Sequence, residues 1–195
     1  MRVISGKFKG RRLKGPQGTG LRPTGDRLKE TLFNILGPGV VDSVVLDVFA
    51  GAGAIGIEAL SRGAREIVFI DSGSEGPRLI RENLELCGVD RGYRIIEQDV
   101  FMALRALARR QFRADIVFFD PPYDWKPYRD LLDILFKKVL VTGSSRVVIE
   151  HYRKADLPET AEEYVRSRVV RQGDHWLSFY ESRSLKPEAG SRKPE

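Results

Sequence analysis

Hydrophobic positions along the chain switch repeatedly between two spacings, and this alternation predicts an α/β fold. Short, nearly continuous apolar runs are typical of strands buried on both faces of a parallel sheet, and we expect them at residues 44–49, 66–70, 94–97, 114–119 and 146–152. Apolar residues with helical spacing lie between these runs, and we expect helices at residues 28–36, 54–62, 77–87, 101–110 and 128–139. The alternation predicts a mostly parallel sheet with helices on both faces.

The pattern changes towards the C-terminus. Residues 165–170 and 176–181 are expected to be two strands joined across Gln172-Gly173-Asp174, a combination typical of a hairpin. We therefore expect an antiparallel C-terminal hairpin at one edge of the sheet. At the other end of the chain, Thr24 and Asp26 are both candidate N-caps of the first helix. The expected organisation is a basic N-terminal extension at residues 1–26, an α/β domain at 27–183 and a disordered tail at 184–195.

Length and composition restrict the class of protein. The 195 residues are enough for one full-sized core, and 42% hydrophobic with 31% charged residues is typical of a globular protein. No apolar run has the length of a membrane span, and no signal peptide is recognisable, so we expect a cytoplasmic protein. The single Cys87 forms no internal disulfide, and His151 and His175 lack metal-ligand spacing. We expect no metal and a monomer.

Positive charge is concentrated at the N-terminus. The first 29 residues hold nine basic side chains and one acid, Asp26, which is a net charge of +8, whereas the whole chain carries +6 and the remainder therefore about −2. Val3, Ile4, Phe8 and Leu13 recur at strand-like intervals between glycines, which favours an ordered β-hairpin over a solvated basic tail. The extension is expected to bind a polyanion through the polar residues Lys9, Arg11, Arg12, Arg22, Thr24, Arg27 and Lys29.

A glycine-rich loop stands between the first predicted strand and the helix that follows. Gly51, Gly53 and Gly56 form the pattern G-x-G-x-x-G, which in this position brings the backbone close to a nucleotide-like ligand. Asp71 follows Gly51 by twenty residues and ends the next strand, where its carboxylate can accept from both hydroxyls of a ribose. These features alone fit a nicotinamide enzyme equally well.

The sequence Asp120-Pro121-Pro122-Tyr123 follows the fourth predicted strand, where open α/β sheets place a ligand crevice. Two prolines fix φ and remove two donors, so the loop is stiff. An exocyclic base amine is a poor nucleophile, because its lone pair is delocalised into the ring. A fixed carboxylate orients such an amine towards an electrophile while an aromatic ring stacks on the base. Trp125 and Tyr128 either line the same pocket or pack in the core.

These motifs resemble those of a known family. The Asp47-x-Phe49-x-Gly51-x-Gly53 loop and the Asp-Pro-Pro-Tyr loop look like those of class I amino-methyltransferases. The segments Arg-Pro-Thr-Gly-Asp-Arg-Leu-Lys-Glu at 22–30, Phe-Asn at 33–34 and Glu-Ala-Leu-Ser-Arg-Gly-Ala at 58–64 resemble the bacterial RsmD family of 16S ribosomal RNA guanine-N2 methyltransferases. The resemblance covers about residues 1 to 183. The segment Ser-Gly-Ser-Glu-Gly-Pro at 72–77 is richer in glycine than the family pattern.

The resemblance implies a Rossmann-like class I methyltransferase fold, S-adenosyl-L-methionine as cofactor and 16S ribosomal RNA as substrate, with naked RNA and RNA within an assembling small subunit as open alternatives. It places the cofactor against Asp47, Phe49, Ala50, Gly51, Gly53, Gly56, Asp71, Ser72, Asp99 and Val100. It places the base and the methyl transfer at Asp120, Pro121, Pro122 and Tyr123, and RNA contacts on the basic extension. Asp99 fits a helix N-cap and an adenine contact equally well.

Other functions share parts of this pattern. A DNA adenine-N6 methyltransferase needs the same catalytic loop, but we see no sizeable target-recognition insertion. A protein glutamine-N5 methyltransferase also shares the loop and leaves the basic extension unexplained. A non-enzymatic RNA-binding module leaves both loops without a role, and a nicotinamide oxidoreductase leaves the Asp-Pro-Pro-Tyr loop without one.

Overall fold

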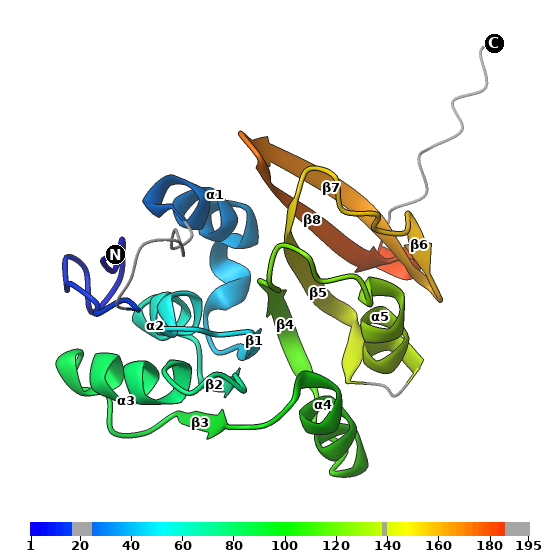
Figure 1. The fold of residues 1–195 in the computed structure, drawn as a ribbon. Helices are drawn as coiled ribbons and strands as arrows, with labels where there is room; N and C mark the ends of the chain where they lie inside the picture. The colour runs from blue at the N-terminus through cyan, green and yellow to red at the C-terminus, as the bar shows by residue number, and fades with distance from the viewer. Residues whose placement is uncertain (17–24, 138–139, 186–195) are drawn as a thin grey trace.

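An eight-stranded sheet runs through the molecule (Figure 1). The computed structural model describes residues 1–16, 25–137 and 140–185. The strand order is β3-β2-β1-β4-β5-β8-β7-β6, in which pairing is parallel from β3 to β5 and antiparallel from β5 to β6. The strands are β1 (Val44–Val48), β2 (Glu66–Ile70), β3 (Tyr93–Ile96), β4 (Ala114–Phe119), β5 (Val141–Tyr152), β6 (Thr160–Ala161), β7 (Tyr164–Gln172) and β8 (His175–Ser182).

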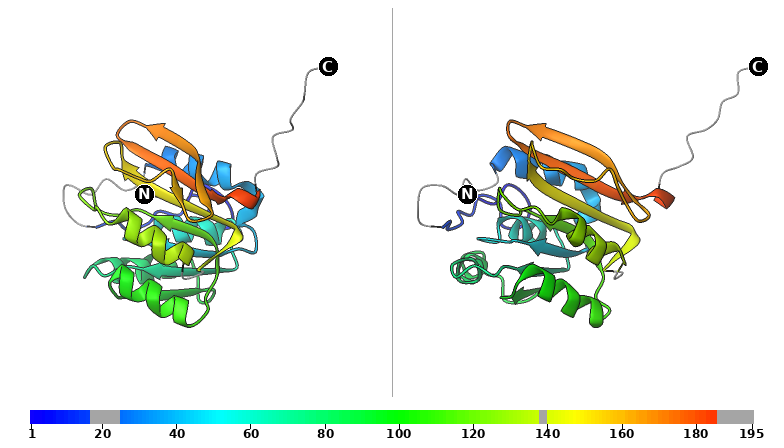
Figure 2. Two further views of the ribbon diagram at one scale, coloured as in Figure 1. Left: turned by 90° about the vertical axis from the view of Figure 1, so that its right-hand side faces the viewer. Right: turned by 45° about the vertical axis from the view of Figure 1, so that its right-hand side comes forward.

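Helices cover both faces of the sheet, as the sequence predicts (Figures 1 and 2). One face carries α1 (Asp26–Leu36), α2 (Ala54–Ser61) and α3 (Gly76–Leu86), and the other carries α4 (Val100–Arg109) and α5 (Tyr128–Lys137). Two short 3-10 helices, η1 (Gly37–Val40) and η2 (Arg183–Leu185), follow α1 and β8. Gly25 occupies the N-cap position of α1, Asp26 is its first residue, and Thr24 lies outside the described residues.

The central strands are buried because both of their faces are covered. All five residues of β1 are buried between β2 and β4. The register pairs Val48 with Ile70 on one side and with Phe119 on the other. Three strand ends therefore lie side by side, and the loops that leave them begin at neighbouring points on one edge of the sheet. This is the edge where parallel sheets bind ligands.

The antiparallel edge has one topological feature that matters for the site. Strand β8 lies between β5 and β7 in the sheet and is antiparallel to β5. The register of this pair places Tyr152 opposite His175. The first residue of β8 is thereby placed beside the last residue of β5. The predicted C-terminal hairpin is confirmed, with Gly173 and Asp174 at its turn. The chain between β5 and β7 adds the two-residue strand β6, which the sequence pattern did not predict.

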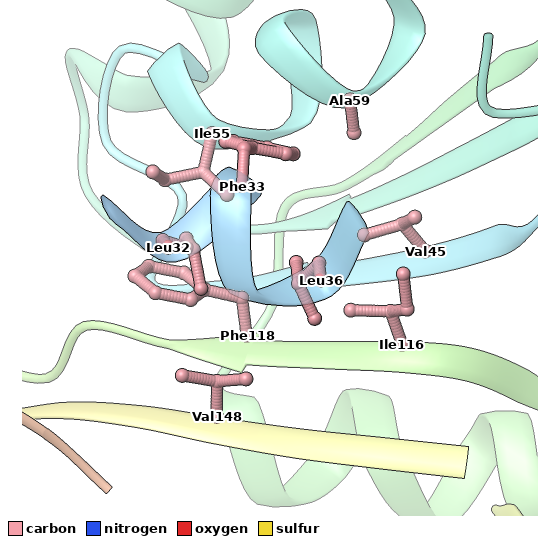
Figure 3. A pocket seen from close by; sticks show the side chains of 9 residues that line it. All are labelled: Leu32, Phe33, Leu36, Val45, Ile55, Ala59, Ile116, Phe118 and Val148. Carbon is pink, nitrogen blue, oxygen red and sulfur yellow. The ribbon is translucent and has the colours of Figure 1, made fainter. Parts of the chain in front are cut away.

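The core between α1, α2 and the sheet is almost completely filled. Figure 3 shows the apolar side chains that surround a small void in this core. The void has a volume of about 10 Å³. The side chains come from α1, α2, β1, β4 and β5, and include Phe33, Ile55 and Phe118. A void of this size has room for about one water molecule, which needs polar partners that these side chains do not offer. This space is a packing feature and not a ligand site.

The N-terminal segment, residues 1–16, is held against the helical face. Its antiparallel pairing is a single bridge between Arg2 and Arg12, and the chain between them bends and turns over residues 5–10. Val3 and Leu13 are buried. The backbone amides of Ile4 and Ser5 donate to the carboxylate of Glu58 on α2, at 2.7 and 3.0 Å. The segment is therefore ordered, whereas the predicted limits of the extension and of the C-terminal tail stay predictions.

A second set of contacts ties the same segment to α3. Asn83 accepts from the amide of Lys14 at 2.7 Å and donates to the carbonyl of Lys14 at 3.0 Å. The same side-chain amide also donates to the carbonyl of Ala52 in the glycine-rich loop, at 2.9 Å. One buried side chain thus connects the N-terminal segment to that loop.

Among the described helices, none combines the length and apolarity that crossing a membrane requires.

Candidate active site

A cavity of about 460 Å³ opens at the edge where β1, β2, β4 and β5 end. Its volume is in the range of small-molecule sites. It brings together loops that are far apart in the sequence, and the predicted site residues along its wall are Asp47, Phe49, Ala50, Gly51, Asp71, Ser72, Asp120, Pro121, Pro122 and Tyr123. The glycine-rich loop and the Asp-Pro-Pro-Tyr loop therefore face one space. No group of three or more metal-ligating side chains occurs in the part of the chain that the structure describes.

The glycine-rich loop turns sharply between β1 and α2. Phe49, Gly51 and Gly53 have φ angles of 59°, 53° and 77°, in the left-handed region. Glycine adopts this region without penalty, whereas a residue such as Phe49 is strained there. The Phe49 ring packs against Trp125, with centroids 5.5 Å apart, which helps to hold the strained turn. Strained backbone of this kind is common where a loop is shaped for a ligand.

Asp71 links the glycine-rich loop to the loop after β2. Its Oδ2 accepts from the Gly51 amide and its Oδ1 from the Gly73 amide, both at 2.7 Å. A Cβ added at Gly76 would lie 2.6 Å from Oδ1 of the same carboxylate. The glycines that set the segment 72–77 apart from the family pattern thus make room for Asp71 and hydrogen bond to it. Each carboxylate oxygen keeps a lone pair for a ligand hydroxyl.

Asp47 lies deeper in the cavity wall and is 2% exposed. Its Oδ2 accepts from the amide of Gly56 at 2.9 Å. Burial raises the pKa of Asp47 well above its ordinary value, and the nearby carboxylates of Asp120 and Asp71 raise it further against the lowering effect of the Gly56 hydrogen bond. The cavity therefore concentrates negative charge, which favours a cationic ligand over an anionic one.

The Asp-Pro-Pro-Tyr loop leaves β4 beside β1, since the amide of Asp120 donates to the carbonyl of Val48 at 3.3 Å. The amide of Trp125 donates back to the carbonyl of Pro122 at 2.9 Å, which closes a turn around Tyr123. The Tyr123 ring is 53% exposed although it borders the cavity. Burial raises the pKa of Tyr128, which lies behind the loop and near Asp120, to about 12. Tyr128 therefore stays neutral as a wall of the cavity.

Some predicted cofactor residues lie outside the cavity wall. Gly53 is the N-cap residue of α2. Gly56 allows α2 to pack closely on β2, because a Cβ at Gly56 would lie 2.3 Å from the Phe69 ring. Asp99 is the N-cap of α4 and accepts from the amides of Phe101 and Met102. Val100 is buried at the start of the same helix. The helix-cap role of Asp99 is thus observed, and its adenine contact stays a prediction.

Strands β5 and β8 contribute four residues of the cavity wall to which the sequence pattern assigned no functional role. Glu150, His151 and Tyr152 end β5, and His175 begins β8. The Nδ1 atom of His175 lies 3.0 Å from Oε1 of Glu150, and its Nε2 lies 3.4 Å from the hydroxyl of Tyr123. The rule that ligands bind at the carboxyl ends of parallel strands could have found the three residues of β5. His175 had no such signal, because its strand runs in the opposite direction.

The predicted RNA-binding residues divide into two groups. Lys9, Arg11, Arg12 and Arg27 are exposed, while Arg22 and Thr24 lie outside the described residues. Within the described residues, no salt bridge involves the exposed four. Two residues of the N-terminal segment, Met1 and Pro16, reach the cavity wall. The two ends of the basic segment therefore lie at the cavity, whereas its middle packs on the C-terminal end of α2, where the amides of Lys7 and Phe8 donate to Ser61.

Lys29 does not fit the prediction that it contacts RNA. It is 1% exposed, its Nζ donates to the carbonyl of Arg2 at 2.5 Å, and it lies 3.6 Å from the carboxylate of Glu58. Burial lowers the pKa of Lys29, and the opposing influence of Glu58 is smaller. Glu58 also pairs with Arg62 at 2.7 Å. This buried cluster fixes the N-terminal segment to α1 and α2, so the role of Lys29 is structural.

Known proteins resemble this chain along nearly its whole length. The family model described as "Conserved hypothetical protein 95" matches residues 1–181. YlbH of Bacillus subtilis, which its name assigns provisionally to the rRNA methyltransferases, is 37% identical over 183 residues, or 94% of this chain and 100% of its own. Ribosomal RNA small subunit methyltransferase D of Escherichia coli (strain K12) is 34% identical over 158 residues, which cover 81% of this chain and 78% of the relative.

Solved structures confirm the Rossmann-like methyltransferase fold. YhhF of Escherichia coli, provisionally titled a methyltransferase, superimposes with a TM-score of 0.81 at 31% identity, over 93% of this chain and 97% of that one. An RNA methyltransferase from Salinibacter ruber, solved in complex with S-adenosyl-L-homocysteine, shares the fold at 20% identity, with a TM-score of 0.62 over 86% and 97% of the two chains. With a family model matched over residues 1–181 and motifs in the expected order, this chain belongs to the RsmD family.

Proposed function

We propose that this protein is an S-adenosylmethionine-dependent methyltransferase that modifies the exocyclic N2 amine of a guanine in 16S ribosomal RNA. One observation carries the proposal: the Asp-Pro-Pro-Tyr loop and the paired Asp71 and Gly51 line the same cavity. A cofactor held by Asp71 and Gly51 would meet a base held by the Asp-Pro-Pro-Tyr loop inside this cavity. Family membership and the names of the relatives support ribosomal RNA as the substrate class.

The charge of the cavity supports the proposed cofactor. S-adenosylmethionine carries a sulfonium and an ammonium group, and when bound it supplies an electrophilic methyl group. The carboxylates of Asp71 and Asp120 and the buried carboxyl of Asp47 suit these cations. A dinucleotide would bring its anionic pyrophosphate into the same space. The geometry at Asp71 suits a ribose, since a lone pair on each oxygen can accept from a hydroxyl.

The catalytic loop would present the amine to the methyl group. The Asp120 carboxylate accepts hydrogen bonds from the amine, which turns the nitrogen lone pair towards the electrophile. Tyr123 offers a half-exposed ring on which a planar base can stack. Pro121 and Pro122 stiffen the loop between these two groups. The methylated nitrogen is positively charged and loses its proton readily, so the reaction needs no strong base.

The exposed cations of the N-terminal segment support a nucleic acid over a protein substrate. Lys9, Arg11 and Arg12 give exposed positive charge to a segment whose ends, Met1 and Pro16, line the cavity. Arg27 on α1 adds a further exposed cation, and such charge attracts a phosphate backbone. A glutamine in a protein gives these cations no role. We further propose that the protein is a cytoplasmic monomer whose substrate is 16S RNA within an assembling small subunit.

The test is a methylation assay followed by identification of the product. Purified protein and methyl-labelled S-adenosylmethionine are incubated separately with naked 16S RNA, small-subunit particles, duplex DNA and a protein extract. The nucleic acids are digested to nucleosides and analysed by mass spectrometry. We expect N2-methylguanosine from an RNA-containing substrate and none with the Asp120→Ala variant. N6-methyladenosine or labelled protein as the main product would contradict the proposal.

A further inference from the structure

Tyr123 is in contact with two aromatic side chains from the antiparallel edge of the sheet. Its hydroxyl lies 3.4 Å from Nε2 of His175, the first residue of β8. Its ring centroid lies 5.7 Å from that of His175 and 6.3 Å from that of Tyr152. Because β8 lies beside β5, the register places His175 directly opposite Tyr152. The C-terminal hairpin thus reaches the side chain that we propose stacks on the base.

The partners of His175 define its tautomer. Its Nδ1 lies 3.0 Å from Oε1 of Glu150, a residue that is only 2% exposed. A carboxylate next to Nδ1 favours a proton on that nitrogen. In the neutral ring with this tautomer, Nδ1–H donates to Glu150 and Nε2 carries the lone pair. The Tyr123 hydroxyl is therefore the donor in the contact with Nε2, and the three side chains form one directed chain of hydrogen bonds.

The ring geometry leaves space for a base. The planes of His175 and Tyr152 are inclined to the Tyr123 ring by 72° and 79°. Neither ring lies parallel to Tyr123, and the Tyr123 side chain remains 53% exposed. The contacts thus restrain the ring without stacking on it. A side chain on a loop has two free χ angles, and contacts to its hydroxyl and its ring restrict both.

We propose that His175, anchored by Glu150, is a positioning residue that holds the Tyr123 ring in the orientation that receives the substrate base. The inference rests on the proposed function, because it assigns Tyr123 its stacking role. Substrate misplaced by about 1 Å can lose roughly 100-fold in rate. Release of the ring should accordingly lower kcat while the KM for the cofactor is maintained, since His175 acts only through Tyr123.

The kinetic test compares His175→Phe, His175→Gln, Tyr123→Phe and the double variant His175→Phe/Tyr123→Phe. We expect His175→Phe to reduce kcat about 10-fold or more, with the KM for S-adenosylmethionine changed less than twofold. The amide oxygen of glutamine can accept from the Tyr123 hydroxyl, so His175→Gln should recover much of the rate. The double variant should be no slower than Tyr123→Phe alone, because Tyr123→Phe already lacks the hydrogen bond to Nε2 and the phenylalanine of His175→Phe keeps an aromatic ring next to residue 123. If the reductions in kcat of the two single variants multiply in the double variant, the two side chains act independently and the inference is wrong.

A measurement without catalysis separates this inference from the proposed function. The chain has six tyrosines, and ¹⁹F NMR of protein labelled with 3-fluorotyrosine gives one signal for each, with Tyr123 assigned through Tyr123→Phe. We expect His175→Phe to shift and narrow the Tyr123 signal as the ring gains freedom. An unchanged signal would overturn the positioning role even if wild-type protein methylates RNA. A changed signal in a protein that methylates no RNA would support the contact and reject the function.

Trp176→Phe is the matched control for damage to the hairpin. Its indole donates to the carbonyl of Gly173 in the same turn, at 3.3 Å. Successive side chains of a strand point to opposite faces, so Trp176 lies on the other side of β8 from His175. We expect Trp176→Phe to leave kcat and the Tyr123 signal unchanged. If Trp176→Phe reproduces the loss seen with His175→Phe, the effect comes from the hairpin and the positioning role is wrong.

Discussion

The Oδ2 atom of Asp71 accepts a hydrogen bond of 2.7 Å from the backbone amide of Gly51, twenty residues earlier in the chain. This contact joins the loops after β1 and β2 at the point where both line the cavity. The carboxylate therefore has two functions in our proposal. It supports the shape of the glycine-rich loop, and it offers acceptors to the ribose of the cofactor.

Asp71→Ala is expected to weaken S-adenosylmethionine binding by about 10-fold to 150-fold, which corresponds to the loss of a charged acceptor worth about 1.5 to 3 kcal/mol. Isothermal titration calorimetry measures the change. Glu75→Ala is the matched control, because Glu75 is an exposed carboxylate of the same segment that lies outside the cavity wall. Equal affinity of Asp71→Ala and the wild type would reject the ribose assignment.

Asp120→Ala is expected to abolish methyl transfer while cofactor affinity stays within several-fold of the wild type, since the proposed partner of Asp120 is the substrate amine. Asp120→Asn should be less damaging, because an amide oxygen still accepts a hydrogen bond. Single-turnover rates and calorimetry separate the two effects. Asp124→Asn, at an exposed acid of the same loop, serves as the control. Turnover of Asp120→Ala near the wild-type rate would refute the mechanism.

The exposed cations of the N-terminal segment are expected to supply RNA affinity and not chemistry. Changing Lys9, Arg11 and Arg12 together to glutamate should weaken RNA binding and flatten the dependence of log K on log salt concentration by about two to three units, because each lost phosphate contact releases about one counterion fewer. Filter binding across salt concentrations measures the slope. Cofactor affinity should not change.

A control with the same change in net charge is available on the opposite face. Arg105, Arg109 and Arg110 are exposed at or beside α4, which lies across the sheet from the N-terminal segment. Their replacement by glutamate should leave the salt slope close to that of the wild type. Equal slopes for the two triple variants would show that net charge, and not the N-terminal surface, determines binding.

Lys29 is expected to affect stability and not the salt dependence of RNA binding, because it is buried against Glu58. Glu58→Gln should lower the free energy of unfolding by about 3 to 5 kcal/mol, since it leaves Lys29 buried without its carboxylate. Lys29→Met should cost less, because Glu58 retains Arg62 and two backbone donors. Urea unfolding measures both. A flatter salt slope with unchanged stability in Lys29→Met would place Lys29 on the RNA surface after all.

Local sequence signals predicted the elements whose residues face one kind of environment. Strands β1, β2 and β4 were predicted within about a residue of their ends, because helices cover both faces and most residues of these strands are apolar. The start of β5 was missed, since Thr142, Gly143 and Ser144 are exposed and the strand there depends on hydrogen bonds of Ser145 to Thr142 and Ala114. A strand stabilised by polar contacts carries no hydrophobic period.

The difference between local sequence signals and tertiary contacts also explains which site residues were predicted and which were missed. The loops after β1, β2 and β4 were predicted because parallel strands end at one edge, which is a consequence of topology alone. His175 reaches the cavity only because β8 enters the sheet between β5 and β7, a choice that local sequence does not encode. Lys29 was assigned to the surface from its charge. Its burial follows from Glu58, 29 residues away, and the sequence pattern does not reveal that pairing.

Asp47 gives the last prediction, which concerns pH. Folding raises the pKa of this carboxyl group above its ordinary value of 3.8. When the pH is below 3.8, the group is neutral in both the folded and the unfolded protein, so it costs no stability. As the pH rises, the unfolded chain releases the proton first and the free energy of unfolding falls, until the folded form ionises too. Asp47→Asn removes this cost and keeps an oxygen that can accept from the Gly56 amide.

The melting temperature of Asp47→Asn relative to the wild type should therefore increase as the pH rises from about 4 towards 8, by about 2 to 4 °C for each kcal/mol gained. The difference between the two proteins is the useful quantity, because the titration of all other groups, including the buried His151, contributes to both melting curves. Asp90→Asn, at an exposed acid after α3, should show no such trend. Parallel curves for Asp47→Asn and the wild type would contradict the raised pKa of Asp47 and mean that this carboxyl group ionises in the folded protein at little cost.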